Sequence, residues 1–160
     1  IAMTRAADAV DALFLRLMSQ SRDHAFVLLD PDGVVLAWRG AAEALFGYTE
    51  AEAVGQPISF LFTEADNAIG LPAFERRVAV SAGRSEDDRW HVRKDGLSMW
   101  VSGVVTPLHD GESLLGFAKV MRDRTDLRSQ LDTLRDRLLA EATTTIAPCS
   151  RLSSPTGDAT

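Results

Sequence analysis

The chain has 160 residues, of which 46% are hydrophobic and 25% are charged, and its formal net charge is −6. This composition suits one soluble domain with a real core and leaves little for a second domain. The acidic balance argues against nucleic acid as a partner, because nucleic-acid-binding proteins usually cluster Lys and Arg on one face.

No apolar run approaches the roughly 18 to 20 residues that span a bilayer, so we expect no direct membrane insertion and a cytoplasmic location. The single cysteine, Cys149, excludes an internal disulfide and a multi-cysteine metal site. It lies in a Ser/Thr/Pro-rich tail, where we expect an inert, exposed thiol.

An amphipathic helix is predicted near the amino end, over about residues 5–20. Val10, Leu13, Phe14 and Leu17 follow the i, i+3, i+4, i+7 spacing that lines one helix face. A helix with one apolar stripe must cover something, so these four residues are expected to lie on the sheet of the same chain or on a second copy.

A β-hairpin is predicted next. The apolar runs 25–29 and 34–38 flank Asp30-Pro31-Asp32-Gly33, in which Pro fixes one turn dihedral and Gly supplies a positive one. Asp95-Gly96 and Asp110-Gly111 mark two further hairpin turns later in the chain.

Several short helices are predicted between the first and second of these turns. One ends at Gly47, and Thr49 begins the next, with Glu52 completing a capping box. Residues 63–66 can cap another turn, and residues 71–82 form an amphipathic helix that ends near Gly83. A single long crossover helix is therefore not expected.

Three strands follow. Around residue 90, Trp90 and Val92 alternate with Arg89, His91 and Arg93, which predicts a strand with the first pair on the dry face and the second set on the wet face. Residues 98–108 and 114–121 form the last two strands. The predicted order is strand, strand, short helices, three strands.

The carboxyl end predicts a helix over residues 125–141. Leu127, Leu131, Leu134 and Leu138 follow a coiled-coil spacing of four, three and four. Only about two heptads are visible, so a helix folded back onto its own sheet stays an alternative. Residues 142–160 are rich in Thr, Ser and Pro and are predicted to be a flexible tail.

The chain resembles the PAS domain, a sensor module of bacterial signalling proteins such as histidine kinases. The resemblance covers roughly residues 23–125 and rests on several motifs in order. The motifs are Trp38 to Tyr48, Glu52, Gly55, Arg93-Lys94-Asp95-Gly96, Trp100, Thr106-Pro107-Leu108, Gly116-Phe117 and Arg122-Asp123-Arg124-Thr125.

The resemblance implies an α+β PAS fold: a five-stranded antiparallel sheet with short helices on one face, an N-terminal cap helix and a C-terminal signalling helix. The expected boundaries are 1–22 for the cap helix, 23–124 for the PAS domain, 125–141 for the coiled-coil-like helix and 142–160 for the tail. Asp123 and Thr125 match the Asp-x-Thr that couples the last strand to the output helix in this family.

The resemblance also limits the cofactor, whose identity stays unknown. Flavin members that form a cysteinyl adduct carry the cysteine where this chain has Ile58, and haem members place a ligand histidine at what corresponds to Gly70. A cysteinyl-flavin adduct and a histidine-ligated haem are therefore excluded at those positions. Arg39 stands where many relatives have Asn, which puts a ligand-facing amide in doubt.

Apolar side chains are expected to converge between sheet and helices, as a plain core or as a ligand pocket, because both use the same residue types. The pocket candidates are Phe26, Leu28, Leu45, Phe46, Ile58, Phe60, Phe62, Phe74, Val92, Val101 and Phe117. The histidines His24, His91 and His109 are too dispersed for a metal site, and no metal is expected.

The expected function is a non-catalytic sensory and dimerisation module that relays a signal through its last strand and C-terminal helix to an effector domain. A homodimer is expected through residues of both terminal helices. The alternative is a sensor domain that binds a small molecule or a cofactor such as flavin or haem. An enzyme is disfavoured because no nucleophile, base and orienting group can be named together.

Overall fold

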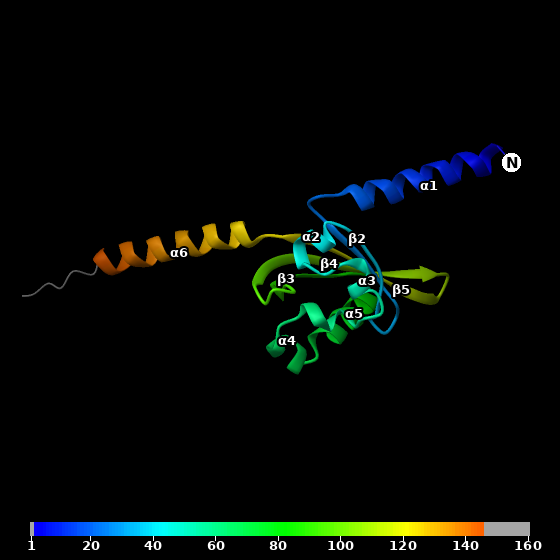
Figure 1. The fold of residues 1–160 in the computed structure, drawn as a ribbon. Coiled ribbons are helices and arrows are strands. Elements are labelled where there is room, and N and C mark those ends of the chain that lie inside the picture. The colour runs from blue at the N-terminus through cyan, green and yellow to red at the C-terminus, as the bar shows by residue number, and fades with distance from the viewer. Residues whose placement is uncertain (1, 146–160) are drawn as a thin grey trace, which may run out of the picture. The chain divides into compact units, whose positions relative to one another are not determined.

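The computed structural model describes residues 2–145, which divide into a first unit ending at Thr125 and a second beginning at Asp126. The first unit holds α1 (Ala2–Gln20), five strands and the short helices between them (Figure 1). The helix α6 (Thr125–Thr145) begins with the last residue of the first unit and forms the described part of the second. Cys149 and residues 146–160 of the predicted tail lie outside the described residues.

The first unit is built on one antiparallel sheet of five strands in the order β2-β1-β5-β4-β3. The strands are β1 (Ala25–Leu29), β2 (Val35–Gly40), β3 (Ser85–Val92), β4 (Ser98–Asp110) and β5 (Ser113–Asp123). The last strand, β5, pairs with β1 on one side and with β4 on the other. It therefore joins the first hairpin to the second half of the sheet.

The turns form where the Asp-Gly pairs predict them. Gly33 donates its N–H to the Asp30 carbonyl at 3.0 Å, and Gly96 donates to the Arg93 carbonyl at 3.0 Å. Both glycines have positive φ, which residues with a Cβ rarely adopt.

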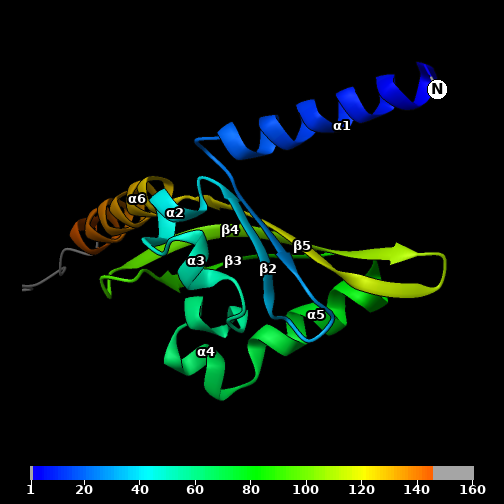
Figure 2. The same ribbon diagram turned by 45° about the vertical axis from the view of Figure 1, so that its right-hand side comes forward.

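Short helices cover one face of the sheet, as Figure 2 shows for α3, α4 and α5. They are α2 (Ala42–Phe46), α3 (Glu50–Ala53), a 3₁₀ turn (Ile58–Leu61), α4 (Glu64–Ala68) and α5 (Leu71–Ala82). The predicted capping box is confirmed: Thr49 accepts from the Glu52 N–H, and the Glu52 carboxylate accepts from the Thr49 N–H. Thr63 caps α4 through its side chain alone, which accepts from the Asp66 N–H at 3.2 Å.

The core lies between this covered face and the helices. Val27 and Leu29 of β1, Val101 of β4, and Phe117 and Met121 of β5 are all buried there. The alternating residues point to the other face of the sheet. We call these the inner and the outer face.

The prediction of which β3 side chains face the core is wrong. His91 is 1% exposed and lies on the inner face, whereas Trp90 is 38% exposed and packs edge-on against Trp100 with ring centroids 5.2 Å apart. The prediction assumed that charged side chains face water. On this strand Arg89 instead points inward, where carboxylates pair with it.

The predicted tail also begins too early, because α6 continues to Thr145. Thr143, Thr144 and Thr145 donate their hydroxyls to the carbonyls of Leu139, Ala140 and Glu141. A hydroxyl within a helix is satisfied in this way by the carbonyl four residues earlier.

Candidate functional site

The pocket candidates separate into two groups. Phe46, Ile58, Phe62, Val101 and Phe117 belong to one buried core cluster, and Leu45 and Phe60 pack against its margin. These seven side chains meet between sheet and helices, as expected. Whether any of them contacts a ligand stays a prediction.

The other four candidates do not join them. Phe26 and Leu28 lie on the outer face, where they line a cleft of about 210 Å³ with Leu15 and Met18 of α1. Val92 follows the buried His91 and so points to the opposite face, and Phe74 is 52% exposed on α5. For Phe26 and Leu28 the physical reason is strand phase: Ala25, Val27 and Leu29 are buried, so the two residues between them face outward.

A buried ion pair lies beside this core, and the sequence did not suggest it. Lys119 on β5 is 1% exposed, Glu75 on α5 is 4% exposed, and the Lys119 Nζ lies 2.7 Å from Glu75 Oε2. Charged residues are almost never this buried unless they are paired.

The pair is part of a larger network that we call the charge cluster: Asp66, Glu75, Asp87, Arg89 and Lys119. The Arg89 Nε lies 2.9 Å from Glu75 Oε1, and the Arg89 guanidinium also pairs with Asp87. Asp66 of α4 is 3.8 Å from Arg89 Nη1. The charge cluster thus connects α4, α5, β3 and β5.

The Phe62 ring belongs to the buried core and contacts the charge cluster. The Lys119 Nζ lies 4.8 Å from the ring centroid and the Arg89 guanidinium carbon 5.7 Å from it, both within cation–π range. The same ring meets the His91 imidazole edge-on at 4.8 Å. One aromatic side chain therefore contacts both cations and the buried histidine.

His91 is held as a neutral imidazole. Its Nδ1 lies 2.9 Å from the Leu61 carbonyl oxygen, so we assign the proton to Nδ1, and Nε2 has no hydrogen-bond partner among the described residues. Burial, and then the nearby charge of Lys119, lower the pKa of His91 to about 3. His91 thus stays uncharged at neutral pH.

The two inner carboxyl groups have opposite pKa shifts. Burial opposes ionisation of Glu75, but its hydrogen bond with Asp87 and the charge of Lys119 hold its pKa below the ordinary value. Burial, and then the hydrogen bond with Glu75, raise the pKa of Asp87 to about 6. Of the two carboxyl groups, Asp87 therefore binds a proton more readily, with half-protonation near pH 6.

We predict that His91→Gln flattens the acid limb of the stability profile. A base whose folded pKa is depressed contributes stability above its unfolded pKa of 6.5, and this stability is lost as pH falls from there towards about 3. Gln keeps a donor for the Leu61 carbonyl and does not titrate. The measurement is urea unfolding between pH 4 and pH 7.5.

Asp87 has the opposite effect on the stability of the fold in part of this pH range. Because its pKa is raised, it adds stability as pH falls through about 6. The variant should therefore gain stability on mild acidification relative to the wild type. Parallel profiles for the two proteins would show that His91 is not charged on unfolding.

Sequence alternation could have placed one member of the charge cluster, Lys119, on the inner face of the sheet. Lys119 lies between Phe117 and Met121 with a period of two, the phase of the inner face, so its inward direction follows from those neighbours. Glu75 had no comparable signal, because helix 71–82 also presents charged residues to water.

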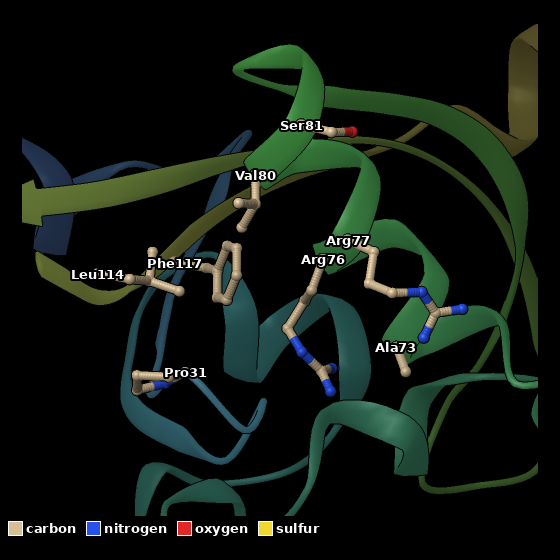
Figure 3. Close-up of a pocket in the computed structure, with 8 residues that line it drawn as sticks. All are labelled: Pro31, Ala73, Arg76, Arg77, Val80, Ser81, Leu114 and Phe117. Atoms are coloured by element: carbon tan, nitrogen blue, oxygen red, sulfur yellow. The ribbon is translucent and has the colours of Figure 1, made fainter. Parts of the chain in front are cut away.

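A second cleft, of about 420 Å³, lies beside α5 and is open to solvent. Figure 3 shows its apolar side formed by Phe117, Leu114 and Val80, while the guanidinium groups of Arg76 and Arg77 point away from them. Asp30 and Asp32 of the first turn lie near enough to Arg76 to offset part of the effect of its burial, which still lowers its pKa.

The predicted relay residues form a compact link at the end of β5. Thr125 donates its N–H to Asp123 Oδ1 at 2.9 Å, and its hydroxyl lies 2.6 Å from the same oxygen. The Trp100 N–H donates to the Thr125 hydroxyl at 3.1 Å, and the Arg124 N–H donates to the Trp100 carbonyl at 2.7 Å. The first residue of α6 is thus bonded to both β5 and β4.

The leucines of α6 and the apolar stripe of α1 have exposed side chains. Leu127, Leu131, Leu134 and Leu138 are each at least 41% exposed, and Val10, Leu13, Phe14 and Leu17 are each at least 49% exposed. Within residues 2–145, no helix is long and apolar enough to cross a membrane, and no group of three or more His, Cys, Asp or Glu side chains could hold a metal ion.

The sheet order, the helices on one face and the strand-to-helix link define a small α+β module of the sensor-domain type. A profile described as the PAS domain matches residues 23–126. The chain belongs to the PAS domain family, whose members are in general non-catalytic sensor modules.

Known proteins agree with this assignment. The chain is 36% identical over 110 residues to "Two-component system protein A" of Emericella nidulans, a match that covers 69% of this chain and 16% of that relative. The PAS domain of a protein from Colwellia psychrerythraea superposes with a TM-score of 0.60 at 23% identity, covering 79% of this chain and 99% of that one.

A domain of a sensory box sensor histidine kinase/response regulator from Geobacter sulfurreducens gives a TM-score of 0.60 at 20% identity, covering 76% of this chain and 96% of that chain. At this level of identity the two structures establish the shared fold. The curated relative adds that a homologous segment occurs in a protein of two-component signalling.

Proposed function

We propose that this chain is a non-catalytic PAS sensory and dimerisation module of a two-component signalling protein, and that it passes a signal through β5 and α6 to an effector domain. The observation that carries the proposal is the bonding of Thr125, the first residue of α6, to Asp123 and to Trp100 of β4. A change in sheet packing reaches the helix start through these bonds.

The relay has a defined energetic limit. A signal can shift the module between two states only by its differential binding free energy for them, typically about 1–3 kcal/mol. Three hydrogen bonds at one strand end, each worth about 1 kcal/mol, are of the right size to transmit such a difference.

We predict that Thr125→Ala uncouples output from the sensor. The substitution removes the hydroxyl that accepts from the Trp100 N–H and contacts Asp123. Signal-dependent autophosphorylation of the whole signalling protein should change by about fivefold or more. Thr125→Ser, which keeps the hydroxyl, should behave like the wild type, and unchanged output in Thr125→Ala together with Asp123→Ala would overturn the route.

The dimer is supported by two exposed apolar stripes, on α1 and on α6. The spacing of the α6 leucines is that of a two-stranded coiled coil, and Arg128 and Asp132 add an i, i+4 ion pair at 3.3 Å. Isolated helices of this length with one apolar stripe gain stability chiefly by packing on a partner.

We predict a dimer in native mass spectrometry that Leu131→Lys and Leu134→Lys together convert to a monomer. The two lysines remove apolar contacts from the seam of a short coiled coil, and their charges repel the same lysines on the partner helix. The control is Leu115→Lys on the β4–β5 hairpin, where the leucine is 58% exposed, close to the 55% of Leu131. A monomeric wild type, or conversion of the Leu115→Lys control to a monomer, would contradict the coiled-coil dimer.

The same spectrum tests the alternative function, binding of a small molecule. The observation that favours it is the open cleft beside α5, with apolar side chains on one side and two guanidinium groups on the other (Figure 3). A stoichiometric mass added to the chain would support this alternative. A dimer of bare chains would support the relay module. The cytoplasmic location and the bacterial origin of the signalling protein stay predictions.

A further inference from the structure

The charge cluster carries one more negative than positive group. Three carboxyl groups, those of Asp66, Glu75 and Asp87, face two cations, Arg89 and Lys119. Asp66 is the most distant, 3.8 Å from Arg89. The inner four groups would balance if they were all ionised, but Glu75 Oε1 and Asp87 Oδ2 both lie against Arg89 Nε, which carries a single hydrogen, so the two carboxyl groups crowd each other.

The elements packed around Asp87 place the following charged and titratable groups near it. Glu75 comes from α5, Asp66 from α4, Lys119 from β5, and Arg89 and the neutral His91 from β3 itself. The neighbouring strand β4 contributes Gly103, which has no side chain. A Cβ at Gly103 would lie 3.3 Å from Asp87 Oδ1 and 3.8 Å from Lys119 Cε, so the glycine leaves space for the cluster.

We propose that the Glu75–Asp87 carboxyl pair is a proton-operated switch: binding of one proton joins α5 to β3, and its release frees Asp87 from Glu75 and loosens α5 on the sheet. In the protonated state Asp87 donates to the Glu75 carboxylate, which also accepts from Lys119. After deprotonation the two carboxylates repel each other at low local dielectric, and Asp87, whose side chain is 14% exposed, keeps its pairing with Arg89 and turns away from Glu75 towards water.

The pKa of Asp87 sets the pH range over which the switch operates. Burial and the contact with Glu75 raise the pKa of Asp87 from 3.8 to about 6, which is roughly a 100-fold increase in proton affinity. The added stability is fully present below pH 3.8 and is lost as pH rises through about 6. The α5 contact is therefore tight in mildly acidic solution and looser above pH 6.

The switch has a direct structural connection to the strand end. Lys119, which Glu75 holds, lies four residues before Asp123 on β5, and residues 119, 121 and 123 share the same face of this strand. Transmission of the change to an effector rests on the proposed relay function. The switch itself lies within the first unit and can be measured without the effector.

The test is NMR titration of the 160-residue chain between pH 4 and pH 8, with detection of the Asp87 carboxyl carbon and of backbone amides. Because histidine side chains commonly titrate near neutral pH, the measurements are made in a His24→Gln/His109→Gln background. We expect a midpoint near pH 6 for Asp87, with amides of α5 and of Lys119 to Asp123 shifting at the same midpoint.

Two variants sharpen the result. Asp87→Asn is close to isosteric and permanently neutral, so its amides should keep the acid-form positions throughout the titration. Asp88→Asn is the matched control, because Asp88 is the next residue, faces outward and bonds the Ser102 hydroxyl. The backbone amides of Asp88→Asn should follow the same titration curve as those of the His24→Gln/His109→Gln protein.

The proposal is overturned if Asp87 titrates near the ordinary value of about 3.9, or if the amides of Asp87→Asn follow the same curve as those of the parent. The carboxyl titration of the unsubstituted Asp87 decides the matter even if Asp87→Asn does not fold. If Asp87, α5 and β5 titrate together while kinase output does not respond to pH or to Thr125→Ala, the relay function fails and the switch stands.

Discussion

Lys119→Met is expected to lower the free energy of unfolding by about 3 kcal/mol, and the melting temperature by roughly 10 °C. The substitution keeps the length of the aliphatic stem but leaves Glu75, 4% exposed, without its closest cation. Breaking a buried pair usually costs about 3–5 kcal/mol, and we place this one at the lower end because Arg89 remains 2.9 Å from Glu75. Urea unfolding followed by tryptophan fluorescence measures the loss.

Two further variants separate burial from charge. Adding Glu75→Leu to Lys119→Met should recover most of the loss, because an apolar pair replaces an uncompensated carboxylate. Lys94→Met is the matched control: Lys94 pairs with Glu52, but both side chains are at least 41% exposed, so water screens the pair and little stability should change. Equal losses in Lys119→Met and Lys94→Met would show that burial does not determine the cost.

Gly116→Ala is expected to destabilise the fold by about 3 kcal/mol, through overpacking between β5 and β1. A Cβ at position 116 would lie 2.1 Å from the carbonyl oxygen of Leu29, which belongs to the backbone and cannot turn aside. The strands would have to separate where Leu29 pairs with Phe117. Thermal unfolding and amide exchange of β1 measure the effect.

The comparison for this variant is Gly111→Ala at the tip of the β4–β5 hairpin. Gly111 has a φ of 58°, but a Cβ there meets nothing within 4 Å. Only the backbone preference is lost, which costs about 1–2 kcal/mol. A smaller loss for Gly116→Ala than for Gly111→Ala would mean that close approach of the two strands is not the reason for glycine at position 116.

The local elements were predictable because neighbouring residues determine them. Asp-Gly pairs require turns wherever apolar runs flank them, and Thr49 with Glu52 completes a capping box without help from distant parts of the chain. The order of strands and helices along the chain followed, and the resemblance to the PAS family gave one five-stranded antiparallel sheet with short helices on one face, whereas the strand order within that sheet came from the structure. The link through Asp123 and Thr125 was also expected from that resemblance.

The site was predictable only in its apolar part. Phe46, Ile58, Phe62, Val101 and Phe117 converge as expected, since large apolar side chains in the right phase must be buried. Phe26 and Leu28 were misplaced because a strand of apolar residues gives no alternation from which to choose its inner face.

The sequence by itself determined where this chain turns, which helices are capped, and that an amphipathic helix leaves its last strand. Only the tertiary structure decided that Arg89 and His91 face inward and that Glu75 meets Lys119. Lys119 and Glu75 are 44 residues apart in the chain, and a charged side chain is buried only when its partner arrives from elsewhere in the fold. Local sequence carries no record of that partner, so the charge cluster appears only once β3, β5 and α5 are assembled.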